Sequence, residues 1–199
     1  MKNWIFFTGA PGSRWSGVSQ KIRDDFENVD NTDLTEDKKY THHKYSGHIG
    51  NYYGPGMANG QWLAESFGTN RMWEEEINKS FNGPEDSWKL ILSHNFAYYL
   101  EQIKKQYPDS KLVMCYRPDN LCYDWWHEAG GWDISWPDYS WYENNVKMRK
   151  EINSQNRAIL EFVYKHKLPL RKPGREWYRN TWGVDRCFIF EKDVWIAEC

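Results

Sequence analysis

Apolar runs separated by amphipathic stretches give the chain a regular alternation. Three short apolar runs predict strands at 3–8, 88–93 and 111–116, because runs without polar alternation are typical of strands buried on both faces. The clearest amphipathic stretch is 96–106, whose apolar positions follow the i, i+3, i+4, i+7 spacing of a helix face. Strands that alternate with helices predict a mainly parallel sheet with helices on both faces. We therefore expect a three-layer α/β fold.

Other stretches complete this pattern. Further helices are predicted at 15–27, 61–81, 119–128 and 141–166, and a hairpin at 186–198. Residues 28–60 are polar, rich in Gly and Asn, and show no clear period. A loop of that length in a compact domain is usually functional or mobile, so we expect a mobile lid there. Neither a repeat nor a linker divides the sequence, and residues 1–199 are expected to form one domain.

The charges of the chain nearly cancel. Lys and Arg number 26 and Asp and Glu number 28, for a formal net charge of -2. This balance argues against a general affinity for nucleic acid or anionic membranes, but it allows a local basic pocket. No apolar run approaches the roughly 20 residues of a membrane-spanning helix, and the N-terminal run is too short for a signal peptide. The four cysteines form no CxxC pair, so we expect reduced thiols in a soluble, cytoplasmic protein.

Aromatic residues are abundant, with 13 Trp, 13 Tyr and 9 Phe. Five tryptophans crowd one short segment: Trp125, Trp126, Trp132, Trp136 and Trp141. They form either a stacking platform for a sugar or planar acceptor, or packing beneath the helix at 141–166. Three histidines also cluster, at His42, His43 and His48, but no acidic or cysteine partner stands at ligand spacing, so we expect no metal.

Ligand sites in parallel α/β sheets lie at the carboxyl ends of the strands. The first turn to arrive there is "GAPGSRWS", residues 9–16. Its backbone N–H groups stand at a helix N-terminus that favours anions. Ser13 and Ser16 add hydroxyl donors, and Arg14 adds a cation. The turn therefore predicts an anion site, and a purely structural strand–turn–helix is the alternative.

Two further turns carry polar side chains. His94 directly follows the strand at 88–93, where it is either a structural residue or a general base with a pKa near neutrality. Arg117 ends the strand at 111–116 and precedes a proline. Its planar guanidinium suits either a phosphate or a surface salt bridge.

Taken in order, these pieces resemble the PAPS-dependent sulfotransferases. "FFTGAPGSRWSGV" is similar to that family's loop for the 5'-phosphosulfate, and "LILSHNF" to its strand ending in the catalytic histidine. "DSKLVMCYRPDNLCYDWW" is similar to its strand and 3'-phosphate arginine, and "LRKPGREWYRN" weakly resembles its basic C-terminal segment. The interval of 23 residues between His94 and Arg117 also matches.

The resemblance implies a P-loop-like transferase that moves a sulfuryl group from PAPS to a hydroxyl or amine of a small-molecule or carbohydrate acceptor, without a metal. His94 would be the general base, and Arg14 would stabilise the leaving group. Trp15 is a candidate to stack on the adenine. The implied nucleotide-binding residues are Pro11, Gly12, Ser13, Arg14, Trp15, Ser16 and Arg117, with help from Arg171, Lys172 or Arg175.

Two positions depart from the family pattern. Gly12 replaces the lysine or arginine that neutralises the bridging oxygen, and Trp125 replaces the serine that assists the 3'-phosphate arginine. These departures leave a second reading open, in which the chain binds a nucleotide or a sugar without catalysis. A P-loop phosphotransferase such as a nucleotide kinase is a third reading, although Arg14 and Trp15 occupy the positions of the GK pair.

Overall fold

A five-stranded parallel sheet forms the centre of the computed structural model, which describes residues 3–25, 28–30, 32, 51–53, 72–133, 142–167 and 194–198. The strand order is β2-β3-β1-β4-β5, and every pair of neighbours is parallel. The strands are β1 (Trp4–Gly9), β2 (Asn51–Tyr52), β3 (Lys89–Leu92), β4 (Lys111–Tyr116) and β5 (Val194–Glu198). The predicted α/β class and parallel sheet are confirmed.

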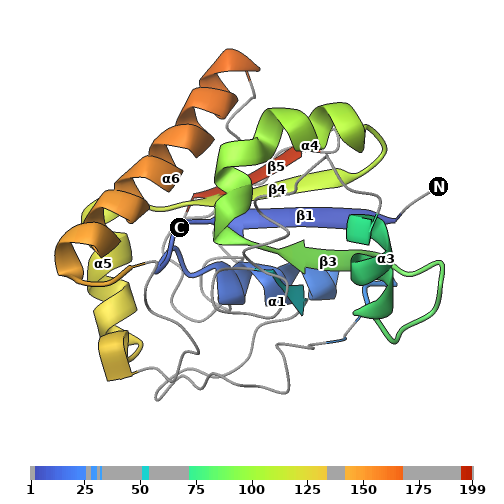
Figure 1. Cartoon of the computed structure of the whole chain (residues 1–199), viewed down its shortest axis with the longest axis horizontal. Coiled ribbons are helices and arrows are strands. Elements are labelled where there is room, and N and C mark those ends of the chain that lie inside the picture. The colour runs from blue at the N-terminus through green and yellow to red at the C-terminus, as the bar shows by residue number, and fades with distance from the viewer. Residues whose placement is uncertain are drawn as a thin grey trace.

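Helices join these strands and cover the sheet (Figure 1). Among the described residues, the α-helices are α1 (Trp15–Asp25), α3 (Met72–Lys79), α4 (Leu100–Gln106), α5 (Asp119–Glu128) and α6 (Asn145–Lys165). Two 3-10 helices, η2 (His94–Tyr99) and η3 (Gly131–Asp133), precede α4 and follow α5. Among the described helices, none is long and apolar enough to cross a bilayer.

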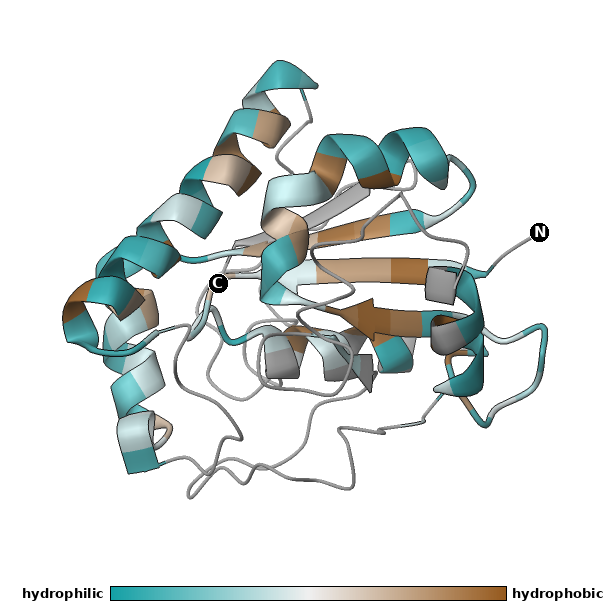
Figure 2. Cartoon of the chain, in the orientation of Figure 1, coloured by the Kyte–Doolittle hydropathy of each residue, from teal (hydrophilic) through white to brown (hydrophobic). Residues whose placement is uncertain are grey.

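The central strand β1 divides the core into two clusters. Phe7 packs with Trp15 and Ile22 of α1 on one side of the sheet. Phe6 packs with Phe96 and Ile159, from η2 and α6, on the other. Figure 2 shows the result, with hydrophobic strands inside and the hydrophilic faces of α4, α5 and α6 turned outward. The alternation of side chains along one fully buried strand therefore places helices against both faces.

Several predicted boundaries hold and others shift for local reasons. β4 and α5 have the bounds predicted for 111–116 and 119–128. The helix predicted at 96–106 starts earlier, as η2, because the Ser93 side chain accepts a hydrogen bond from the Asn95 amide. The helix predicted at 141–166 starts later, because the Asn144 side chain accepts bonds from the first amides of α6.

Two predictions for less regular segments need correction or completion. The stretch 28–60 was expected to be a loop, but it contributes β2, which pairs with β3; residues 33–50 and 54–60 lie outside the described structure. Only part of the helix predicted at 61–81 is described, and this part contains α3. The predicted hairpin contributes β5, which pairs in parallel with β4, and its expected partner strand lies outside the described residues.

Candidate functional site

The turn after β1 is shaped by two backbone conformations that a regular element does not allow. Gly12 has a φ of 77° and Arg14 a φ of 62°, both in the left-handed region. The Ser13 amide donates to the Ala10 carbonyl at 3.0 Å, which closes the turn. The Arg14 carbonyl then accepts from the Gly17 amide at 3.0 Å, so α1 begins directly after it. The predicted strand–turn–helix is therefore present.

This turn packs tightly against β4 and α5. A Cβ on Gly9 would lie 2.7 Å from the Ser13 Oγ and 2.9 Å from the Cys115 Cβ. A Cβ on Gly12 would overlap the Cys122 carbonyl of α5. Both positions therefore require glycine because neighbouring atoms fill the space of a side chain. A lysine or arginine side chain at position 12 would meet the same overlap.

Ser13 points into the protein rather than out of the turn. The residue is fully buried, and its carbonyl accepts from the Cys115 thiol at 3.1 Å. Its Oγ has no hydrogen-bond partner within the described part of the chain. The predicted donation to an anion would thus require this side chain to turn. Of Ser16 the structure describes the backbone, at the start of α1.

His94 stands at the carboxyl end of β3, as predicted, and is 9% exposed. Its Nδ1 lies 2.5 Å from the Gly9 carbonyl, and since a carbonyl only accepts, Nδ1 carries the proton of this bond. When the imidazole is neutral, its lone pair therefore lies at Nε2. The Thr8 hydroxyl donates to the His94 carbonyl at 3.1 Å. These bonds to β1 fix the position of the ring and the tautomer of its neutral form.

Aromatic rings cover the imidazole. Trp15 stacks on His94 with 3.9 Å between ring centroids and an interplanar angle of 18°. Tyr52 meets the same ring edge-on at 5.5 Å, and its burial raises the phenol pKa well above the ordinary range, so it stays neutral. Trp15 itself is 9% exposed and belongs to the core cluster with Phe7. The ring proposed from the sequence to stack on an adenine is thus occupied by His94.

Arg117 lies at the carboxyl end of β4 and is only 8% exposed. Its Nη1 donates to the Gly12 carbonyl at 3.4 Å, which joins it to the first turn. Its own carbonyl accepts from Asn156 of α6 at 2.7 Å and from the Cys122 thiol at 3.3 Å. None of the ion pairs between described residues includes Arg117. The described residues therefore do not support the alternative of a surface salt bridge for Arg117.

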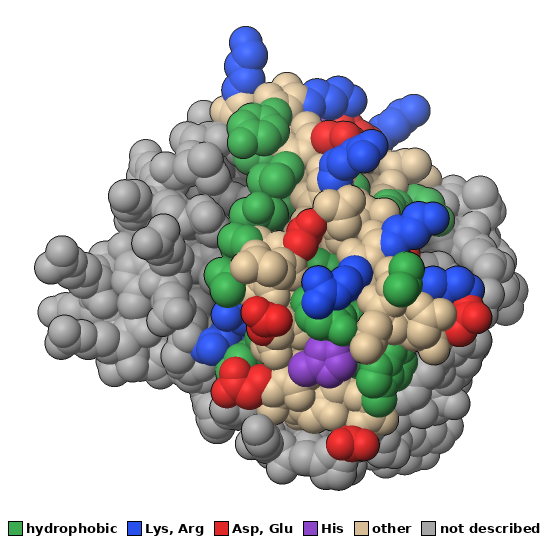
Figure 3. All heavy atoms as spheres, turned by 90° about the vertical axis from the view of Figure 1, so that its left-hand side faces the viewer, with side chains coloured by type: hydrophobic (Ala, Val, Ile, Leu, Met, Phe, Trp, Pro, Cys, Tyr) green, Lys and Arg blue, Asp and Glu red, His purple; other side chains and the backbone are tan. Residues whose placement is uncertain are grey.

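Trp125 lies close to both cations of the site. The guanidinium carbon of Arg14 is 3.7 Å from the centroid of the indole, and that of Arg117 is 5.9 Å from it. The outer faces of α5 and α6 carry Lys and Arg interspersed with Asp and Glu (Figure 3). Among the described residues, the cationic character of the site thus comes from these two arginines.

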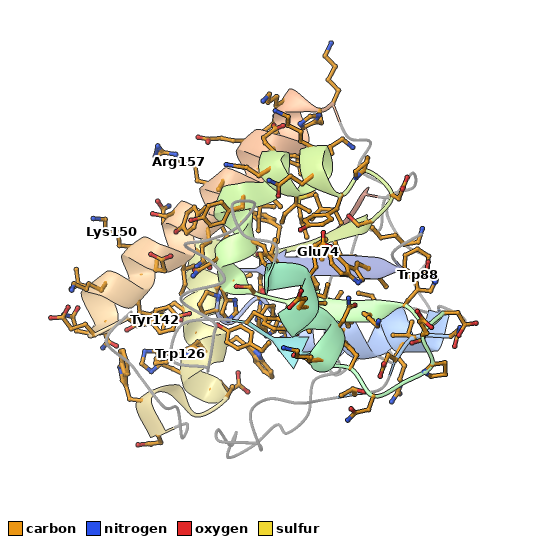
Figure 4. The ribbon with its side chains drawn as sticks, turned by 45° about the vertical axis from the view of Figure 1, so that its right-hand side comes forward. Glu74, Trp88, Trp126, Tyr142, Lys150 and Arg157 are labelled. Atoms are coloured by element: carbon orange, nitrogen blue, oxygen red, sulfur yellow. The ribbon has the colours of Figure 1, made fainter. Side chains whose placement is uncertain are left out.

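The remaining described tryptophans of the cluster pack beneath the long helix. Trp126 is buried with Met148 and Ile152 of α6 and contacts Trp132 edge-on at 4.8 Å. Tyr142 belongs to the same cluster, and Figure 4 shows it close to Trp126, beside the start of α6. For these two tryptophans the structure favours the packing interpretation over the stacking platform. Trp136 and Trp141 lie outside the described residues.

Other predicted residues also fall outside the described structure. They are Arg171, Lys172 and Arg175, together with His42, His43 and His48. Pro11 lies buried in the first turn. Within the described ranges, no group of three His, Cys, Asp or Glu side chains could hold a metal.

Sequence reasoning missed the contributions of Tyr52 and Asn156. A signal for Asn156 does exist, because it is a polar residue on the face of α6 that also carries Ile152 and Ile159. Polar residues on a buried helix face usually make specific hydrogen bonds. Tyr52 carries no such signal, since it lies in a short strand within an irregular stretch.

The structure thus brings the ends of β1, β3 and β4 together, linking His94 and Arg117 to the turn after β1. No protein-family model matches the sequence, and no curated protein matches it significantly. The function is therefore inferred from the residues of this site.

Proposed function

We propose that the chain is a sulfotransferase-like enzyme that transfers a sulfuryl group from PAPS to a hydroxyl or amine acceptor. The observation that carries the proposal is the buried Arg117 guanidinium, which lies beside the turn after β1 and takes part in none of the ion pairs between described residues. Burying a cation is costly unless an anion compensates it. A phosphate of a bound nucleotide supplies that anion.

The proposal includes the finer architecture, a three-layer, P-loop-like sulfotransferase fold. The donor's 5'-phosphosulfate would lie at the turn between β1 and α1, where the helix N-terminus and Arg14 favour negative charge. The 3'-phosphate would lie at Arg117. Arg171, Lys172 and Arg175 remain candidates to assist it. Support comes from the adjacency of β3, β1 and β4, which places the three turns at one edge of the sheet.

The chemistry would centre on the Nε2 nitrogen of His94. With Nδ1 held by the Gly9 carbonyl, Nε2 takes the proton of the acceptor as its oxygen or nitrogen attacks sulfur. The bond between sulfur and the bridging oxygen breaks, and negative charge builds on the departing 5'-phosphate. The α1 N-terminus and nearby guanidinium groups stabilise that charge, so the reaction needs no metal.

One observation favours a second candidate, a member of the fold that binds a nucleotide or sugar without catalysis. The His94 ring is 9% exposed and stacked against Trp15. A base must come within hydrogen-bond distance of the proton it removes. If these rings stay in place when ligands bind, Nε2 is out of reach of an acceptor and only binding remains.

A calorimetric titration with adenosine 3',5'-bisphosphate tests the nucleotide site. We expect micromolar binding by the whole chain, much weaker binding of AMP, and a large loss in Arg117→Ala. Arg157→Ala is the matched control, because Arg157 is an exposed arginine of α6 that pairs with Glu161. No binding of the bisphosphate would refute the proposal, and magnesium-dependent ATP binding in its place would favour a phosphotransferase.

A turnover assay distinguishes the sulfotransferase-like enzyme from a protein that only binds the nucleotide or sugar. Release of adenosine 3',5'-bisphosphate from PAPS, measured with a panel of phenol, sugar and amine acceptors, should depend on His94. Loss of turnover in His94→Ala with retained bisphosphate affinity would support catalysis by this residue. Turnover that is unaltered in this variant would exclude His94 as the general base, and binding without turnover in the wild-type chain would favour the second candidate.

A further inference from the structure

A second group of polar side chains lies between η2 and α6, which pack directly against each other. Its members are Tyr98 of η2 and Glu151 and Gln155 of α6. The Tyr98 hydroxyl donates to Glu151 Oε1 at 2.6 Å, and Gln155 Nε2 donates to the same oxygen at 2.9 Å. The group includes none of the residues assigned above to the site at the strand ends.

Two oxygens of this group lack a hydrogen-bond donor. Both bonds reach Oε1 of Glu151, so Oε2 accepts none within the described structure. Gln155 is 0% exposed, and its Oε1 has no hydrogen-bond partner in the described part of the chain. Its amide cannot be flipped, because only the amide nitrogen can donate to the carboxylate. A buried acceptor of this kind costs free energy unless a bound group supplies the donor.

The carboxylate of Glu151 has no cationic partner within the described ranges. None of the ion pairs there includes it, and Figure 4 shows Lys150, its neighbour in sequence, pointing outward from α6. Burial raises the pKa of Tyr98, the hydrogen bond to Glu151 and its charge raise it further, and a bond with Ser154 opposes the shift. Tyr98 is therefore a neutral donor. At 40% exposure it also leaves the group open to solvent.

We propose that Tyr98, Glu151 and Gln155 form a binding site for a primary ammonium group. An ammonium ion is a compact cation with three donors, two of which match Glu151 Oε2 and Gln155 Oε1. A guanidinium fits less well, because its planar fork pairs with both carboxylate oxygens and Oε1 already accepts two bonds. One carboxylate and one amide are also too few ligands for Mg²⁺ or Ca²⁺. This inference goes beyond the proposed function and does not depend on it.

The test is a titration of the full chain, followed through the side-chain amide of Gln155 in ¹H–¹⁵N NMR spectra. The probes n-butylamine, n-butylguanidine and n-butanol share one alkyl chain and differ in the head group. We expect a saturable shift with butylamine at neutral pH, with a Kd on the order of 1 mM for so small a ligand. Butylguanidine should bind at least about fivefold more weakly, and butanol should give no saturable shift.

Variants show whether the carboxylate carries the binding. Glu151→Gln removes the charge and keeps the shape of the side chain, so butylamine should bind at least about tenfold more weakly. Glu161→Gln is the matched control, because Glu161 is an exposed carboxylate of the same helix that pairs with Arg157, and it should leave binding unchanged. Tyr98→Phe removes one bond that orients Glu151 and should weaken binding by about two- to fivefold.

Other outcomes overturn the inference. Butylguanidine or butanol that binds as tightly as butylamine would exclude an ammonium site, and so would an unchanged affinity in Glu151→Gln. The absence of a saturable shift at Gln155 in the wild-type chain would exclude it as well. Thermal melting identifies variants that fail to fold, and for these the comparison of the three probes on the wild-type chain gives the deciding measurement.

Two further ligands identify the source of the ammonium group. Glucosamine carries it on a small molecule and Nα-acetyl-lysine amide on a lysine side chain, and the tighter of the two indicates the source. Adenosine 3',5'-bisphosphate separates this site from the proposed function. Amine binding in a chain that binds no bisphosphate would refute the proposed function and keep the ammonium site, and the reverse result would refute the ammonium site alone.

Discussion

Each end of the parallel sheet contains a buried charged residue, but the two residues are hydrogen-bonded differently. At the amino ends, Asp30 is 3% exposed and accepts hydrogen bonds from the Thr32 amide and hydroxyl and from the Gly83 amide. At the carboxyl ends, Arg117 is 8% exposed and bonds to the Gly12 carbonyl. Figure 4 shows the ends apart, with Trp88 near one and Trp126 near the other. The Asp30 carboxylate is surrounded by neutral hydrogen-bond donors. The Arg117 guanidinium has further N–H groups besides the one that bonds to the Gly12 carbonyl.

This difference in hydrogen bonding distinguishes a buried charge that stabilises the fold from one that can also bind a ligand. A buried charge surrounded by hydrogen-bond donors or acceptors contributes to the folded state and has little left for a ligand. The carboxyl-end residues Ser13 and Asn95 each leave a buried side-chain oxygen without a partner in the described structure. Incomplete satisfaction of this kind is characteristic of functional sites. Substitutions at the two ends should therefore have different consequences.

The largest effect is expected for Gly12→Ala. The new Cβ would overlap the Cys122 carbonyl, and a φ of 77° disfavours any side chain. We expect a loss of about 3 kcal/mol or more in the free energy of unfolding, measured by urea denaturation. A loss below about 1 kcal/mol would mean that the turn can move away from α5, and the contrast between the ends would weaken.

Asp30→Ala should cost about 2 kcal/mol of stability, because the Gly83 and Thr32 amides lose their buried acceptor. Nucleotide affinity of the folded protein should not change, since this end of the sheet takes no part in the site. Urea denaturation and calorimetry on the same sample check both points. The exposed Asp109→Ala is the control for loss of a negative charge. A change in nucleotide affinity with Asp30→Ala alone would show that the two ends are coupled.

Asn156→Ala should affect both properties. This amide donates to the Arg117 carbonyl and to Asp119, each at 2.7 Å, so stability should fall by about 1.5 kcal/mol. Bisphosphate affinity should fall several-fold because the turn carrying Arg117 is no longer held by α6. Asn153→Ala removes a neighbouring bond to Asp119 without touching Arg117 and should leave the affinity unchanged. Equal effects on affinity in the two variants would contradict a specific role for Asn156.

The smallest effect is expected at a surface pair away from both ends. Hydrogen bonding to Lys165, followed by that to His166, lowers the pKa of Glu101 below its ordinary value, while burial opposes the shift. Its contribution to stability is therefore present above the ordinary carboxyl pKa and is lost as pH falls through the lower folded pKa. Because the side chain is 45% exposed, Glu101→Gln should cost about 0.5 kcal/mol or less near neutral pH. Unfolding curves at pH 7 and in acid, compared with wild type, check the sign.

The elements of the fold were largely accessible from the sequence. The apolar run of β4 and the proline before α5 set the bounds of both, because a short apolar run and a proline each act through local sterics. The start of η2 depends on one Ser93 side chain. β2 escaped prediction because two residues in an irregular stretch form a strand only when β3 is beside them.

The sequence predicts where the residues of the site lie on the sheet, but not the directions in which their side chains point. Strand ends indicate that His94 and Arg117 converge with the first turn, since parallel strands share one edge. The directions of Ser13 and Trp15 depend on positive φ angles at Gly12 and Arg14, which spacing does not encode. The placement of Trp125 beside the Arg14 and Arg117 guanidinium groups is likewise a tertiary contact, which no motif specified.

The central position of β1 has a consequence for how the chain is made. Its six residues are all buried, and they pair with β3 and β4, which are synthesised about 85 and 106 residues later. At translation rates of about 5–20 residues per second, the strand WIFFTG waits several seconds for either partner. During that interval an apolar segment with unpaired edges invites intermolecular pairing. Newly made chains are therefore expected to need a chaperone or a low concentration, and refolding yield should fall steeply as protein concentration rises.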